Sequence, residues 1–75
     1  GAWLTSADLS SAYLRHTDLT RTYLSATNLT DADLSYADLK FAHFTSATVD
    51  GVDFTDAYWY QTLWTDGARY DSDPT

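Results

Sequence analysis

Leucine recurs at every fifth position from Leu4 to Leu39, and the same register continues to Trp64 with Phe, Val or Trp in place of leucine. Two residues before each of these positions stands a small residue, in most cases Ala or Thr. Residues 2–66 therefore form thirteen consecutive units of five. This repeat constrains the fold more than any other feature, because every unit must adopt nearly the same conformation.

Neither regular element accommodates a period of five by itself. In an α-helix this spacing advances about 140° around the axis, so the leucines would form no apolar stripe. In one long strand side chains alternate with period two, so successive leucines would face opposite sides. A short extended segment followed by a bend does fit. The sequence thus predicts a solenoid whose coils stack about 4.8 Å apart.

The five places of each unit have distinct roles, with the small residue at place one and leucine at place three. Places one and three share the inner face, and place two faces outward. Places four and five are mostly polar, which suits a turn. Gly51 is the single glycine at place five. We therefore expect the bends to use backbone conformations that ordinary residues tolerate.

The pattern Ala-Asp-Leu-X-X at residues 7–11, 32–36 and 37–41 resembles the pentapeptide-repeat family, and the resemblance covers residues 2–66. It implies an all-β fold, a right-handed quadrilateral parallel β-helix with four units per coil. Thirteen units then give a little over three coils, a stack of roughly 15 Å. We assign residues 1–66 to the β-helix and 67–75 to a polar C-terminal tail. This tail would fold over the coil end through Tyr70 or fray.

Length and charge restrict the partners. The 75 residues give one small domain with no cysteine, hence no disulfide and no thiolate metal site. The net charge is −7, and residues 50–75 carry six Asp against Arg69. We expect no direct nucleic-acid binding. A cationic protein surface fits better, although solubility explains the charge equally simply. No segment is apolar enough to span a membrane, and the cytoplasm is only a default localisation.

The N-terminal end of the repeat is uncapped. The chain enters the first unit at Ala2 with no preceding cap, which leaves the edge of the first coil open. Either the domain was cut from a longer protein or a partner supplies the missing cap.

Residues twenty apart stack above one another when four units make a coil. One outward column is aromatic or apolar throughout, and Phe41 lies at the corner beside it. Stacked aromatic rings stabilise neighbouring strands, and a contiguous exposed apolar patch also favours protein contact. We name these residues the contact strip: Trp3, Tyr23, Phe41, His43 and Leu63.

The last coil carries larger inner residues than the others. Phe54, Trp59 and Trp64 replace leucine there. They are interpreted either as an aromatic plug that closes the core or as an apolar end that stacks on a second copy. The second interpretation would allow an end-to-end homodimer.

Carboxylates and histidines suggest no catalytic or metal site. Asp18 and Asp38 stack in one column, and we expect each to accept hydrogen bonds from the backbone of the neighbouring corner. A calcium site is disfavoured because each column supplies only two carboxylates. His16, Tyr36 and Asp56 share a column, but a convex solenoid offers no cleft for acid–base chemistry. We expect no enzyme activity, no cofactor and no metal.

Three functions remain open from the sequence. The first is a non-enzymatic protein-interaction or scaffold module, part of a larger protein or assembly, with an unidentified protein partner. The second follows from the resemblance: some pentapeptide-repeat proteins mimic duplex DNA and bind DNA gyrase as inhibitors or protectors. The third is a minimal or designed solenoid without native activity.

Overall fold

Hydrogen bonds between residues about twenty apart determine the architecture. The computed structural model describes residues 2–75, and in it each place-two residue from Trp3 to His43 pairs in parallel with the residue twenty positions later, as Trp3 does with Tyr23. The Leu4 N–H donates to the Tyr23 carbonyl at 2.8 Å, and the Tyr23 N–H donates to the Ala2 carbonyl at 2.9 Å. The same pattern recurs on every side. Four units therefore close one coil, as the family resemblance implied.

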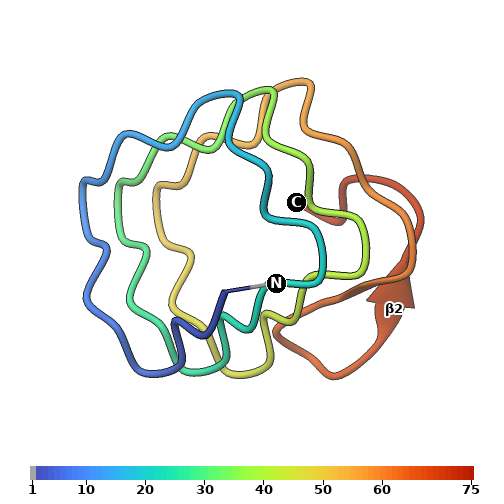
Figure 1. Cartoon of the computed structure of the whole chain (residues 1–75), viewed down its shortest axis with the longest axis horizontal. Coiled ribbons are helices and arrows are strands. Elements are labelled where there is room, and N and C mark those ends of the chain that lie inside the picture. Colours follow the sequence, from blue (N-terminus) through green and yellow to red (C-terminus); the bar gives the residue numbers. More distant parts are fainter. Residues whose placement is uncertain (1) are drawn as a thin grey trace.

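The coils lie one behind another with nearly the same outline (Figure 1). The first coil is blue, the second runs from cyan to green, and the third from yellow-green to orange. The whole molecule measures 25 × 22 × 22 Å. The fold is a quadrilateral parallel β-helix in which the extended segments are too short to form long strands.

The corners differ from what the sequence suggested. The Ala7 N–H donates to the Leu4 carbonyl at 3.0 Å, which closes a four-residue turn. The third residue of this turn, Ser6, has a φ of 61°, and type II turns require a positive φ there. Eleven residues other than glycine occupy place five with φ between 47° and 61°. The expectation that the bends avoid this region was wrong.

A signal for these left-handed corners was present in the sequence. Place four holds Thr in six of the thirteen units, whereas place five holds no Thr, Val or Ile in any unit. β-branched side chains are the least tolerant of positive φ. The absence of β-branched residues from place five therefore indicates that the corner residue has a positive φ.

The core runs along the axis of the coils. Leu24, Leu29, Leu34, Leu39 and Phe44 are completely buried. In the first coil Leu4, Leu9 and Leu14 are only partly buried, because the coil that packs on them covers one side alone.

Threonine can replace alanine at place one because its hydroxyl donates a hydrogen bond to a backbone carbonyl in the core. Thr27 Oγ1 donates to the Leu4 carbonyl at 2.5 Å, and Thr62 Oγ1 donates to the Leu39 carbonyl at 2.7 Å. Both threonines are completely buried. A buried hydroxyl that is hydrogen-bonded in this way avoids the desolvation penalty of an unpaired polar group.

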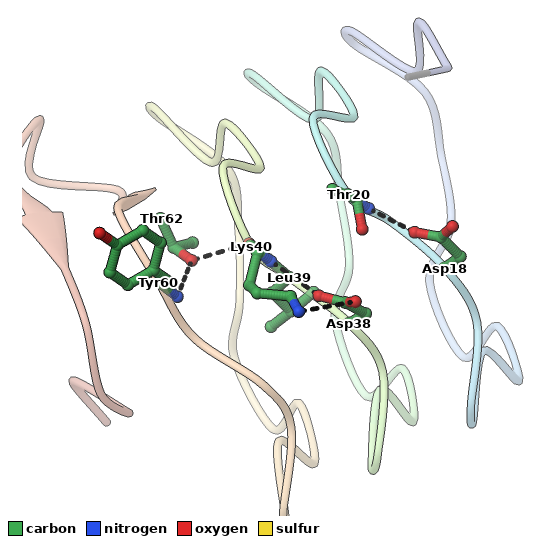
Figure 2. Close-up of polar contacts among 7 residues, drawn as sticks. All are labelled: Asp18, Thr20, Asp38, Leu39, Lys40, Tyr60 and Thr62. Carbon is green, nitrogen blue, oxygen red and sulfur yellow. Dashed lines mark hydrogen bonds and ion pairs between the residues drawn. The ribbon is translucent and has the colours of Figure 1, made fainter.

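The outward aspartates belong to the corners, as expected. Asp18 Oδ1 accepts the N–H of Thr20 at 2.9 Å, and Asp38 Oδ1 accepts the N–H of Lys40 at 3.1 Å. Figure 2 shows both pairs at equivalent positions in successive coils. Lys40 Nζ also lies 3.6 Å from Asp38, an exposed ion pair of small energetic weight. In the units that carry Asp at place two, the carboxylate thus fixes the start of the bend.

Hydrogen bonds at the corners lower the pKa of several of these carboxyl groups. For Asp8 the hydroxyl of Ser10 is the main cause, followed by the Ser10 N–H. Thr20 lowers the pKa of Asp18, and Thr55 lowers that of Asp53, each through its hydroxyl first and its N–H second.

The C-terminal tail folds back on the last coil through its strand β2 and Tyr70. Strand β1 (Thr62–Leu63) pairs antiparallel with β2 (Arg69–Tyr70), so that Leu63 lies opposite Arg69. The connecting turn contains Gly67 at φ 84°. The Tyr70 hydroxyl donates to Asp66 at 2.7 Å. The repeat register therefore ends at Asp66, and the tail is an ordered hairpin arm (red in Figure 1).

Leucines of the second coil are more deeply buried than those of the first, so truncating them should cost more unfolding free energy. Leu34→Ala leaves a cavity in the completely buried centre, where such a change costs about 2–5 kcal/mol of unfolding free energy. Leu14→Ala, in the partly buried first coil, should cost clearly less. Chemical denaturation of the two variants measures this difference. Equal losses would contradict a core centred on the second coil.

Ala26 is an exposed place-five residue with φ 57°. Replacing it with glycine and with valine should therefore change the unfolding free energy in opposite directions. Ala26→Gly should raise the unfolding free energy by about 1 kcal/mol, because glycine adopts this conformation without the steric penalty of Cβ. Ala26→Val should lower it by at least about 1 kcal/mol. Thermal unfolding of both variants checks this. A stabilising valine would refute the left-handed assignment.

The corner hydrogen bonds predict a stability loss in acid. Asp8, Asp18 and Asp53 have folded-state pKa values below the ordinary value. Their contribution is therefore complete above the unfolded pKa of about 3.9 and is lost as the pH falls through the folded pKa. Asparagine serves as the control, because Asn28 already accepts the Thr30 N–H at 3.1 Å. The triple Asp→Asn variant should lose less stability than the wild type below about pH 4, measured as the shift in melting temperature. If the melting temperatures of the variant and the wild type fall equally with pH, the three carboxylates are not the source of the stability loss.

Candidate functional site

Three rings of the contact strip form a continuous stack along one side of the β-helix. The rings of Trp3 and Tyr23 lie 4.3 Å apart at 21°, and those of Tyr23 and His43 lie 4.6 Å apart at 17°. Leu63 pairs with His43 in the next coil and continues the column. The parallel ladder imposes this stack, because it places equivalent residues of successive coils one above another.

Exposure decreases along the column. Trp3 is 76% exposed, whereas Tyr23, His43 and Leu63 are partly buried. The tail contributes to this difference, because Arg69 of β2 lies opposite Leu63. Trp3 and the edges of the two rings below it are thus the accessible part of the strip.

His43 favours its neutral form. Burial lowers its pKa below the ordinary value, and the positive charge of Arg69 lowers it further. A neutral imidazole keeps the stack free of formal charge at neutral pH. No sequence pattern connects Arg69 with this histidine, because the two residues come together only when the tail folds back.

Phe41 lies at the adjacent corner and is not a member of the ring stack. The Arg21 guanidinium carbon lies 4.7 Å from the centre of its ring. Tyr60 meets the Phe41 ring edge-on at 5.5 Å. Tyr60 was missed in the sequence, although a tyrosine at place four, where most units have Ser or Thr, was a visible departure.

The strip differs chemically from the other three outward columns. Each of those contains an Asp, as in the column of Asp18, Asp38 and Tyr58. The column that begins at Trp3 contains neither Asp nor Asn. It is therefore the apolar side of an otherwise acidic molecule.

The aromatic residues of the C-terminal end are also brought together. Phe54 and Trp64 are 5% and 8% exposed, and their ring centres lie 5.4 Å apart. The Trp59 ring is 5.3 Å from both of them. Tyr70 of the tail packs against the same core. These ring contacts form one aromatic cluster at the C-terminal end of the core, and the plug and the stacking end both remain predictions.

The two histidines do not lie together, since His43 belongs to the contact strip and His16 to another outward column. His16 stacks on Tyr36 at 4.9 Å, and both residues are exposed. No cluster of three His, Asp, Glu or Cys residues able to hold a metal is found in the described part of the chain. The same residues include no helix of the length and apolarity that crossing a membrane requires.

Comparison with known proteins gives consistent results for the fold. The family model for pentapeptide repeats matches residues 7–40 and 22–58, with eight copies. A pentapeptide repeat protein, Rfr23 from the cyanobacterium Cyanothece 51142, superposes with a TM-score of 0.81 at 27% identity, over 83% of this chain and 43% of that one. No curated protein sequence matches significantly.

A second solved structure is that of HetL, a pentapeptide repeat protein involved in heterocyst differentiation regulation from the cyanobacterium Nostoc sp. strain PCC 7120. It matches with a TM-score of 0.45 at 29% identity, over 91% of this chain and 40% of that one. The chain thus spans less than half the length of either solved relative.

The family match covers more than half of the chain, and the bridges between residues twenty apart supply the four-unit coil. The fold is that of a right-handed quadrilateral β-helix. This chain belongs to the pentapeptide repeat family.

Proposed function

We propose that this chain is a non-enzymatic protein-interaction module that binds a partner protein through the contact strip. Proteins of the pentapeptide repeat family are generally non-enzymatic. The single observation that carries the proposal is the ring stack of Trp3, Tyr23 and His43 on the one outward column without Asp or Asn.

Rigidity and composition support this assignment. Each ring stacks on a neighbouring ring, and the residues of Tyr23 and His43 are bridged to the coils on both sides, whereas Trp3 is bridged to Tyr23 alone. Less side-chain entropy therefore remains to be lost on binding. Tryptophan and tyrosine are enriched in the well-packed centres of protein interfaces. A flat, ordered edge bearing both residues has the properties of a preformed contact surface.

The DNA-mimic alternative fits the geometry less well. The longest dimension of the molecule is 25 Å, whereas one turn of B-DNA spans about 34 Å. Only an end-to-end dimer would approach that length. Tyr70 of the tail packs against the hydrophobic core, and Asp71, Ser72 and Asp73 lie beside Phe54 and Trp59 of the end through which such a dimer was expected to form.

The chain contains a matched control for testing the strip. Trp3 and Tyr13 occupy the same place in the first coil and are 76% and 75% exposed. The strip variant combines Trp3→Ser with Tyr23→Ser, and the control is Tyr13→Ser. The strip variant loses two stacked pairs, Trp3 with Tyr23 and Tyr23 with His43. Each should cost only about 0.2–1 kcal/mol, so both proteins should remain folded.

The readout is the recovery of proteins from a lysate of the source cells on the immobilised chain, quantified by mass spectrometry. Wild type and Tyr13→Ser should retain the same partner, and the strip variant should lose it by about tenfold or more. Equal recovery by the strip variant and the control would eliminate the strip as the binding surface. Absence of any specifically retained protein would count against the interaction module itself.

A further inference from the structure

A pocket of about 470 Å³ lies between the last coil and the tail, on a different side from the contact strip. Its size is within the range of about 300–1,000 Å³ that is typical of ligand sites. The pocket is a shallow depression broadly open to solvent, and both the coil and the tail contribute to its walls. The lining residues are Phe54, Asp56, Ala57, Tyr58, Trp59, Asp71, Ser72 and Asp73.

The lining combines aromatic surface with negative charge. Phe54 forms a nearly buried part of the wall, and Tyr58 is 59% exposed. Three carboxylates line the same space, and neither Lys nor Arg does. The nearest cation in the tail, Arg69, donates to the Gln61 carbonyl at 2.8 Å. The charge of the pocket is thus left without a counter-charge from its own walls.

The three carboxylates differ in the hydrogen bonds that they accept from the protein. Asp71 Oδ1 accepts the N–H and Nε2 of Gln61 at 2.9 and 3.1 Å, which holds the tail in place. Asp73 Oδ1 accepts the Thr75 N–H at 2.8 Å. Asp56 is an exposed residue of the corner beside Tyr58.

We propose that this pocket binds an arginine side chain carried by an extended basic segment of a protein partner. A guanidinium group stacks on aromatic rings and forms paired hydrogen bonds with carboxylates, so it matches both components of the lining. Cation–π attraction is strongest at tryptophan and adds to the attraction of the carboxylates. Six Asp among residues 50–75 against a single Arg favour a basic partner around the pocket as well.

The test is a ¹⁵N-NMR titration of the full chain with the peptide acetyl-Gly-Arg-Gly-amide. The matched neutral ligand is the same peptide with citrulline in place of arginine, which keeps the shape and removes the charge. The indole N–H of Trp59 is a built-in reporter, because Nε1 is buried and has no hydrogen-bond partner within the described structure. The arginine peptide should shift this signal and the amides of Ala57 and Ser72, with a Kd on the order of 1 mM or below.

Two variants distinguish binding at the pocket from nonspecific attraction to the net negative charge of the protein. Asp56→Asn removes one negative charge at the pocket, and Asp50→Asn removes one from an exposed aspartate outside it. Asp56→Asn should weaken the arginine peptide about fivefold or more, and Asp50→Asn should leave its Kd nearly unchanged. Neither residue belongs to the contact strip, so failure here is distinguishable from failure of the proposed function.

Several outcomes would overturn the proposal. They are equal binding of the citrulline peptide, equal effects of Asp56→Asn and Asp50→Asn, or chemical-shift changes confined to residues remote from the pocket. Absence of any shift at millimolar peptide would do the same. Binding of free N-acetyl-arginine amide without binding of the peptide would reassign the pocket to a small guanidinium compound and refute the peptide occupant.

Discussion

The parallel backbone ladder between residues twenty apart is the constraint on which the rest of the structure depends. Each unit contributes three extended residues, and a left-handed residue at place five then turns the chain by one side. The inner leucines and the outer columns are consequences of this geometry. A change in the conformation of one corner would therefore displace the outward residues of every unit that follows.

Most of the winding follows from the sequence, because a period of five excludes a helix and a long strand and leaves one geometry that buries the leucines. Periodicity did not give the number of sides. That number came from the family resemblance, and the bridges between Trp3, Tyr23 and His43 confirm it. The left-handed corners were not predicted, because glycine, the usual residue at positive φ, stands at place five only at Gly51. The informative feature was the absence of β-branched residues at place five.

The candidate sites were predictable to different extents. The column of Trp3, Tyr23 and His43 follows directly from the twenty-residue stacking, so the sequence predicts its contacts almost completely. The environment of His43 and the pocket beside Asp56 depend on the tail, which obeys no period. Its course is set by the pairing of Leu63 with Arg69 and by the hydrogen bonds from Gln61 to Asp71. Contacts of this kind cannot be predicted from a local sequence pattern.

The four-sided winding also restricts how a surface of this kind can change in length. Insertion of one unit of five residues would rotate all later units by a quarter of a coil, so a ring in the column of Trp3 would no longer lie above its former neighbours. Insertion of twenty residues would extend every column by one step and leave each side intact. An outward ring stack such as that of Trp3, Tyr23 and His43 is therefore compatible with growth by whole coils only.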